Sequence, residues 1–422
     1  MAFRSRHTVK INKDEAMSIL KGNTPLMLLA QIGALLGFAA YPVTLTTLQE
    51  QWALTNFQSG LIASSFFVGY ILLVPFATAL TDQMDARRIY LLGSSLAIGG
   101  LFGMGFWAND FYSACLCMAI NGAGLAATYM PGLKILSDRL TQGEITRHIS
   151  FYTAFFGVGT GLSYVVSGWV LNLGDWHHVY RWVALGPSIS FLIVYFLVRP
   201  MRHDHWQQGI QINWRDIFPI AKWKQVLENR NASGFILGYT VHSLELFASR
   251  SWLVAFFILS TQLSGEQFFL AATTLAGVIN FFGVPASILG NEVALKIGRQ
   301  KWVCIVMITS AIFGVSLAYA MGHASWLILA LAVGHAIFIM ADSATLTAGL
   351  VTSADEKIKG AAMGLHSLMG FGGGLLGPAI FGFVLDLTGS QSDRISWIWA
   401  YASIVIWGVL FVMYERRKGW VH

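Results

Sequence analysis

Residues 78–88 read TALTDQMDARR, a short charged loop that separates two long apolar runs. A reduced copy, GRQK at residues 298–301, also lies between two apolar runs, with Arg299 placed 212 residues after Arg87. The flanking runs are each about 20 residues or longer, the length that an α-helix needs to cross a bilayer. The recurrence predicts two similar halves, each built from membrane-spanning helices.

Twelve apolar runs along the chain are long enough to be membrane-spanning helices. The first six lie near residues 25–47, 57–80, 88–107, 111–137, 149–172 and 179–198. The second six lie near residues 234–261, 267–290, 301–321, 325–352, 358–386 and 395–414. We therefore predict an all-α membrane protein with 12 transmembrane helices in two six-helix, pseudo-symmetric bundles.

Polar segments around these runs give the expected domain bounds. Residues 1–23 form a cytoplasmic N-terminal segment, and residues 24–198 form the first bundle. Residues 199–232 are a basic cytoplasmic linker, residues 233–415 form the second bundle, and residues 416–422 are a cytoplasmic tail. The linker is the longest polar stretch between two runs, as expected for a joint between two bundles.

Composition indicates a bilayer environment and excludes a soluble multidomain protein. Of the 422 residues, 55% are hydrophobic and 11% are charged, whereas soluble domains contain about 25% charged residues. The mean hydropathy is +0.60. Lipid takes the place of the polar surface that a soluble chain of this length would need.

The basic residues are distributed asymmetrically. All of the 27 Lys and Arg except Arg181, Arg250 and Arg394 fall in alternate loops or in the termini. Lys and Arg are retained on the cytoplasmic side of a membrane, so this pattern sets the topology. We predict a multi-pass protein of a bacterial-type inner membrane with both termini in the cytoplasm. The net charge of +6 is thereby explained without a nucleic-acid partner.

The sequence gives no sign of enzymatic, metal or cofactor chemistry. Cys115, Cys117 and Cys304 lie in apolar runs, without a second ligand at metal-binding spacing. Catalytic HExxH or GxSxG motifs and a nucleotide-binding loop do not occur. We expect no enzyme, no metal and no cofactor. The expected partners are a small-molecule substrate, protons as the candidate coupling ion and the lipid bilayer, and we expect a monomer.

The charged loop resembles the loop motif of the major facilitator superfamily, which is Gly, three residues, Asp-Arg-x-Gly and then paired basic residues. The matching residues are Asp82, Arg87 and Arg88 in the first half and Gly298, Arg299 and Lys301 in the second. Thr78, Gln83 and Asp85 depart from the motif. The resemblance implies transport by alternating access, with a gating loop that latches the cytoplasmic faces of the two halves together.

Three further stretches resemble bacterial permeases labelled nitrate/nitrite or cyanate transporters. They are AATYMPG at 126–132, ELFASRSW at 245–252 and MADS at 340–343. Nitrate porters of this kind carry a central arginine in the second and eighth helices, whereas 57–80 and 267–290 contain neither Arg nor Lys. This resemblance therefore leaves the substrate open.

Ionisable residues inside the expected spans are the candidates for substrate binding and coupling. A charge near the middle of a bilayer costs at least about 2.5 kcal/mol, so each must be paired or functional. The candidates are His242, Glu245, Arg250, His335, Asp342 and His366. We expect Arg250 to hold an anionic group while Glu245 or Asp342 binds a coupling proton, tuned by the histidines. The alternative is a structural ion pair between Arg250 and one carboxylate, with Asp342 as the candidate partner.

The first bundle offers polar but uncharged candidates. They are Asn121 and Tyr129, together with Gln31, Tyr41, Tyr70 and Tyr164. Ordinary packing is the alternative interpretation for most of the aromatic residues. We predict a secondary active transporter that moves a small solute, an organic or inorganic anion, across the inner membrane, with proton coupling as the candidate energy source. A non-transporting receptor or sensor of the same fold and a passive facilitator remain as alternatives.

Overall fold

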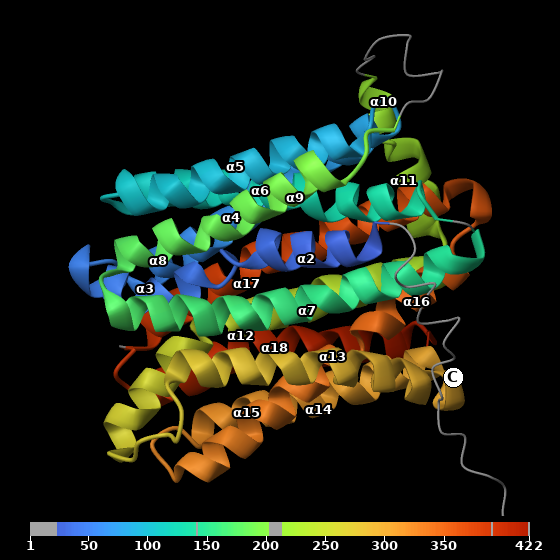
Figure 1. Ribbon diagram of the computed structural model, residues 1–422. Helices are drawn as coiled ribbons and strands as arrows, with labels where there is room; N and C mark the ends of the chain where they lie inside the picture. Colours follow the sequence, from blue (N-terminus) through green and yellow to red (C-terminus); the bar gives the residue numbers. More distant parts are fainter. Residues whose placement is uncertain (1–22, 141, 202–212, 390, 421–422) are drawn as a thin grey trace, which may run out of the picture.

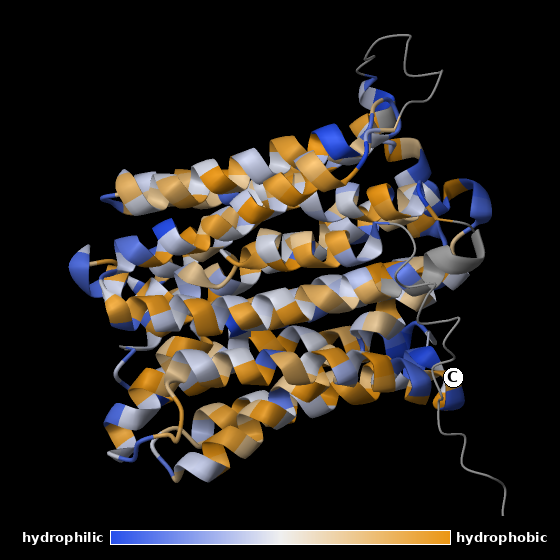
Figure 2. Cartoon of the chain, in the orientation of Figure 1, coloured by the Kyte–Doolittle hydropathy of each residue, from blue (hydrophilic) through white to orange (hydrophobic). Residues whose placement is uncertain are grey.

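The computed structural model describes residues 23–140, 142–201, 213–389 and 391–420. Within these residues every regular element is helical, and 12 helical segments are long and apolar enough to cross a membrane. The predicted fold class and number of spans are therefore confirmed. Figure 2 shows apolar residues along the helices and polar residues gathered at their two ends.

The helices follow the predicted order along the chain. The first half comprises α2 (Thr24–Leu35), α3 (Ala40–Gln51), α4 (Asn56–Thr81), α5 (Ala86–Phe106), α6 (Phe111–Ser137), α7 (Gln142–Leu173), α8 (Trp176–Val183) and α9 (Leu185–Leu197). The linker carries α10 (Trp214–Ile217) and α11 (Ile220–Glu228). The second half comprises α12 (Arg230–Ser264), α13 (Ala272–Ile297), α14 (Arg299–Tyr319), α15 (Ser325–Met340), α16 (Ser343–Ser353), the 3-10 helix η2 (Glu356–Ile358), α17 (Lys359–Thr388) and α18 (Arg394–Arg417).

Short polar side chains begin many of these helices. Thr55 caps α4 by accepting a hydrogen bond from the backbone N–H of Gln58, and Asp110 caps α6 through Ser113 in the same way. Such caps satisfy amide groups that have no partner inside the helix, and they stop one helix from merging with the next across a short turn.

The helices run between two ends of the molecule, which we name by their contents. The linker end carries α10, α11 and the start of α12, at the right in Figure 1; the far end carries the α3–α4 turn and α8, at the left. The α17–α18 turn also lies at the far end, because α17 starts at the linker end and crosses once.

The two halves approach each other most closely where glycines replace side chains. A Cβ added to Gly60 of α4 would lie 2.3 Å from the carbonyl oxygen of Pro378 in α17, and one added to Gly382 would lie 2.2 Å from the carbonyl oxygen of Asn56. A second contact joins α7 to α13, where a Cβ at Gly168 would lie 2.0 Å from Thr273 Oγ1. Small residues permit this backbone-to-backbone packing.

An aromatic layer continues the contact between the halves toward the middle of the molecule. Phe67 of α4 packs on Phe247 of α12 with ring centroids 4.6 Å apart, and Tyr70 stacks on Phe371 of α17 at 3.7 Å. Tyr164 of α7 donates a hydrogen bond of 2.6 Å to the backbone carbonyl of Arg250. These contacts hold α12, a helix of the second half, against α4 and α7 of the first half.

Three of the spans are broken into two helices. The first span breaks between α2 and α3, the sixth at Ala184, and the tenth between Met340 and Ser343. Asp342 lies at this last break and precedes the first turn of α16. The sequence predicted one continuous tenth helix, so the break is a correction to that prediction, and it places a buried acidic side chain between two helices.

Candidate functional site

The candidate site is built on α12, whose residues from Val241 to Phe257 are all buried. Most helices of the molecule bury one face and offer the other to lipid, but α12 is surrounded by helices of both halves. His242, Glu245 and Arg250 therefore lie away from lipid, as ionisable groups within a membrane must. The surrounding elements α14, α15, α16 and α17 supply their neighbours.

Two histidine–carboxylate pairs link α12 to the tenth span. His242 Nδ1 lies 2.8 Å from Asp342 Oδ1, and Glu245 Oε1 lies 3.1 Å from His335 Nε2. All four side chains are buried. Each carboxylate thus has a polar partner, so neither acid is isolated in an apolar environment.

Ser310 of α14 completes the second pair. Its hydroxyl donates to Glu245 Oε1 over 2.5 Å, so one carboxylate oxygen receives bonds from two different helices. Ser310 could not be predicted from the sequence, since a single serine in an apolar helix carries no signal of its own. Only the packing of α14 against α12 identifies it.

His366 belongs to the edge of this cluster nearer the linker end. Its ring stacks on Tyr239 with centroids 3.9 Å apart, and Tyr239 in turn stacks on His242 at 5.6 Å. His366 Nε2 lies 3.2 Å from the Thr347 hydroxyl. Tyr239 was also missed, although it precedes His242 by three positions and shares its helix face.

Arg250 has no carboxylate partner among the described residues. Its side chain is only 8% exposed, and the hydrogen bond found for its guanidinium is a weak one from Nη2 to Met340 Sδ at 3.9 Å. The expected partner, Asp342, is paired with His242 instead. The predicted ion pair between Arg250 and Asp342 is therefore absent, because the break in the tenth span turns Asp342 toward His242.

A small cavity of about 30 Å³ adjoins Arg250 between α12, α13 and α15. Its polar lining consists of Arg250 and Ser249 from α12, Asn280 from α13 and His335 from α15. His335 thus lies between the cavity and Glu245. An anion placed beside Arg250 would adjoin the same imidazole that contacts the buried carboxylate.

The polar candidates of the first half differ in how they meet this cluster. Asn121 is buried in α6, and Tyr129 packs against Tyr152 and Phe156 with ring centroids 5.9 and 5.5 Å apart. These ring contacts are within the first half. Two first-half candidates reach the second half: Tyr70 stacks on Phe371 of α17, and Tyr164 donates to the Arg250 carbonyl.

The charged loop of the first half binds within its own half. Arg87 donates from Nε to the carbonyl oxygen of Val194 near the end of α9, and its guanidinium lies over the ring of Tyr195. Asp82 and Arg88 are exposed. Across the described residues, none of Asp82, Arg87 and Arg88 forms a hydrogen bond or ion pair with the second half.

The buried acid of this loop is Asp85, which the resemblance did not single out. It accepts from the backbone N–H groups of Arg87 and Met201 over 3.1 and 2.9 Å, and it lies 3.6 Å from the guanidinium of Arg139. Asp85 therefore fastens α5 to the ends of α6 and α9. A signal was present, because Asp85 lies directly before a helix where an N-cap is expected.

The second copy of the loop makes fewer contacts. Gly298 has a φ of 97°, which suits glycine, between α13 and α14. Arg299 donates to the Thr352 hydroxyl over 3.2 Å, and Lys301 is exposed. These contacts also stay within one half, so the two loop copies share sequence but differ in structure.

The fold and this site define a polytopic membrane protein made of two helical bundles, the second of which holds a buried polar cluster. The chain belongs to the Major Facilitator Superfamily, whose family description matches residues 27–291. The superfamily implied by the charged loop is thereby confirmed.

Relatives of known name differ in how much of the chain they match. The chain is 23% identical over 392 residues to the "Probable L-galactonate transporter" of Escherichia coli K12, covering 87% of this chain and 84% of that protein. It is 26% identical over 219 residues to "Protein spinster homolog 3" of Danio rerio, covering 50% of this chain and 43% of that protein. The second match thus spans less than half of the spinster protein.

Solved structures share the fold at low sequence identity. A bacterial homolog of the human lysosomal transporter Spinster, inward-facing and occupied, has a TM-score of 0.74 at 13% identity, covering 96% of this chain and 98% of that one. A D-xylose–proton symporter has a TM-score of 0.72 at 13% identity, covering 93% and 96%. Identities this low support the fold alone.

Proposed function

We propose that the chain is a secondary transporter of a small organic anion of the sugar-acid class, and that Arg250 binds the carboxylate of the substrate. The observation that carries this proposal is the buried guanidinium of Arg250, which lacks a carboxylate partner among the described residues and lines a cavity. A relative that covers most of the chain is named for L-galactonate, a sugar acid that is an anion at neutral pH.

The charge of Arg250 gives the physical reason. Removing a guanidinium from water is costly unless an anion or a set of acceptors replaces the lost hydration. Arginine presents a planar fork of donors that matches a carboxylate with two parallel hydrogen bonds. Ser249 and Asn280 beside it offer further hydrogen-bonding groups, which suit the hydroxyl groups of a polyol chain.

The cavity has to enlarge to hold such a molecule, since about 30 Å³ suffices only for water. All of its lining residues belong to the second half, so the enlargement requires α12, α13 and α15 to move relative to one another during the transport cycle. We place the linker end and both termini on the cytoplasmic side of an inner membrane, on the basis of the distribution of Lys and Arg.

The two histidine–carboxylate pairs support proton coupling. With neutral histidines, the buried cluster holds two carboxylates and one guanidinium, and an incoming anion would add a further negative charge. A proton taken up by His335 or Glu245 next to the cavity offsets that charge. We therefore propose symport of the anion with at least one proton.

Other anions also have to be tested as substrates. The resemblance to permeases labelled nitrate/nitrite or cyanate transporters suggests a smaller anion for the same arginine, whereas the relatives named above are spinster proteins and an L-galactonate transporter. A passive facilitator or a receptor of the same fold would retain binding at Arg250 but lack proton-driven accumulation.

The decisive experiment is uptake into proteoliposomes with an inward proton gradient. L-Galactonate, its uncharged lactone, nitrate and cyanate would be compared, and we expect uptake of the sugar acid but not of the lactone. Substitution Arg250→Gln should abolish both uptake and ligand-induced thermal stabilisation, which for a ligand at about 100 times its Kd is about 2.7 kcal/mol. Arg181→Gln is the matched control, because Arg181 also lies in a span but binds the Gly105 carbonyl at the far end.

Two outcomes would contradict the proposal. Binding and uptake that survive Arg250→Gln would show that the arginine is structural, and uptake of the lactone at the same rate would exclude recognition of charge. Proton coupling is tested separately with Glu245→Gln, which should preserve exchange of labelled substrate while removing acceleration by the proton gradient.

A further inference from the structure

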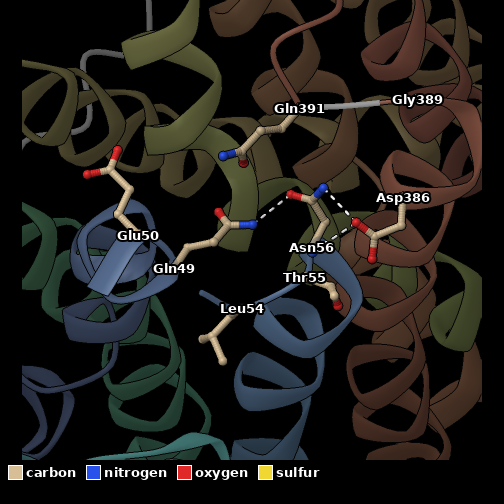
Figure 3. A pocket seen from close by; sticks show the side chains of 8 residues that line it. All are labelled: Gln49, Glu50, Leu54, Thr55, Asn56, Asp386, Gly389 and Gln391. Atoms are coloured by element: carbon tan, nitrogen blue, oxygen red, sulfur yellow. Dashed lines mark hydrogen bonds between the residues drawn. The ribbon is translucent and has the colours of Figure 1, made fainter. Parts of the chain in front are cut away.

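Asp386 of α17 fastens the two halves together at the far end. Its Oδ1 accepts from the backbone N–H and the side-chain amide of Asn56 over 3.0 and 2.8 Å, and its Oδ2 accepts from the backbone N–H of Phe57 over 2.8 Å. Asn56 and Phe57 are the first two residues of α4, in the other half. Figure 3 shows Asn56 between Gln49 and Asp386, with the dashed bonds converging on it. We call these three bonds the far-end clamp.

The placement of Asp386 is unusual for its own helix. It lies in the last turn of α17, where the carbonyl end of a helix disfavours a negative charge. The opposite holds at the first turn of α4, whose free amide groups favour an anion. The charge of Asp386 is therefore stabilised by α4 of the other half and destabilised by its own helix. Its net stabilising effect exists only while the two halves are in contact at the far end.

Backbone packing beside the clamp fixes its geometry. Gly382 lies one turn before Asp386 and meets the Asn56 carbonyl, and Gly60 meets the Pro378 carbonyl further along the same two helices. Larger side chains at either glycine would hold the carboxylate away from the amides. The contact between α4 and α17 thus brings Asp386 to the start of α4 only when the far end is closed.

The clamp is anchored on one side and open to water on the other. Gln49 of α3 donates to Asn56 Oδ1 over 2.8 Å, which fixes the side-chain amide that Asp386 accepts from. A recess of about 340 Å³ lined by these residues, Glu50 and Gln391 adjoins the clamp. Water in such a recess can replace each bond as it breaks, so the clamp can open and close repeatedly.

We propose that the far-end clamp of Asp386 on the start of α4 is the lock that holds the far side of the transport path shut. It must be released whenever the path opens to that side. The proposal rests on contacts between the two bundles and is independent of the substrate and of Arg250. At the linker end, by contrast, the bonds described for Asp85, Arg139 and Arg299 do not join the two halves.

The test measures opening at the far end in the full chain. Spin labels at Asn109→Cys and Gln267→Cys, both exposed at the far end in different halves, would report the distance between the halves in a background with Cys115, Cys117 and Cys304 changed to Ala. We expect Asp386→Asn to increase the far-end-open population about tenfold, which corresponds to about 1.4 kcal/mol. Asn56→Asp should open the far end further, since it places two carboxylates in contact.

A charge exchange and a matched control keep the test falsifiable. The double substitution Asn56→Asp with Asp386→Asn restores an amide–carboxylate pair and should return much of the closed population. Asp393→Asn is the control, because Asp393 is an exposed far-end acid that caps α18 within its own half through Ile395. Unchanged distances in folded Asp386→Asn and Asn56→Asp, or equal opening in Asp393→Asn, would overturn the proposal.

Discussion

The two ends of this molecule hold their charged residues in different ways. At the far end, Asp386 bonds across the boundary between the halves to Asn56 and Phe57. At the linker end, Asp85 bonds to Met201 at the start of the linker and lies near Arg139 of the first half. Charges at the far end therefore join the bundles, whereas charges at the linker end stabilise each bundle separately.

This difference indicates that opening the linker end costs less free energy than opening the far end. Parting the bundles at the far end would break the clamp and the glycine contacts of Gly60 and Gly382. At the linker end, the hydrogen bonds and ion pairs of the charged loops survive such a movement, because both members of each pair travel together. The four predictions below test this comparison, from the largest expected effect to the smallest.

The largest effect is expected from a bulky residue at a glycine where the backbones of the two halves meet. Gly60→Leu should lower the free energy of unfolding or of far-end closure by more than about 2 kcal/mol, because its Cβ would overlap the Pro378 carbonyl. Thermal unfolding and the far-end spin-label distance measure the two effects. Gly99→Leu is the control, since no atom lies within 4 Å of a Cβ built there. Equal behaviour of both variants would contradict the close contact.

At the linker end, the acid that matters for stability is expected to be Asp85. Asp85→Ala removes the cap of α5 and leaves the partly buried amide of Met201 without its acceptor, so the free energy of unfolding should fall by about 2 kcal/mol. Asp82→Ala should change it by less than about 0.5 kcal/mol, because Asp82 is exposed. Thermal unfolding distinguishes them. A larger loss of stability in Asp82→Ala than in Asp85→Ala would contradict this prediction and favour the latching role that the resemblance implied for Asp82.

The paired loops should differ although their sequences match. Arg87→Ala should cost about 1 kcal/mol, because Arg87 binds a free carbonyl near the end of α9 and a cation there is favourable. Its repeat mate Arg299 binds only a threonine hydroxyl, and Arg299→Ala should stay within about 0.5 kcal/mol. Unfolding temperatures of the two variants, measured side by side, give the comparison. Equal losses of stability in Arg87→Ala and Arg299→Ala would contradict this prediction and show that the two loop copies stabilise their halves equally.

The smallest effect concerns a far-end acid that does not cross between the halves. Hydrogen bonds from the side chain and backbone of Ser113 hold the pKa of Asp110 below its ordinary value. Its stabilising effect is complete above the ordinary pKa and is lost as the pH falls through the lowered one. Asp110→Asn should therefore flatten the decline in unfolding temperature between about pH 5 and pH 2. The far-end distance should not change with this substitution, in contrast to Asp386→Asn.

Sequence reasoning located the spans well because length and hydropathy are local properties. The 12 spans agree with the predicted ones to within a few residues at most ends. It missed the breaks in the first, sixth and tenth spans, since an apolar run gives no sign of a change in helix direction. The break at Asp342 matters most, because it decides that this acid meets His242 and not Arg250.

Partners within the site could be predicted only where two residues share one helix. His242 and Glu245 are three positions apart on α12, and both do face the tenth span. Ser310 and the far-end clamp were not predicted, because their partners are 65 and about 330 positions away in the chain and depend on how whole bundles pack. The loop motif identified charged residues but not what they bind.

The glycine contacts between α4 and α17 also bear on how quickly the bundles can part. Interlocking side chains must change rotamers before two helices separate, and each change adds to the activation barrier. Gly60 and Gly382 instead offer backbone surfaces with no side chain to withdraw. At these two positions the helices can part and return without a change of rotamer, although the rings of Phe57 and Phe383 beside them must separate. The glycine contacts can therefore seal the far end tightly without adding to the barrier that opposes its opening.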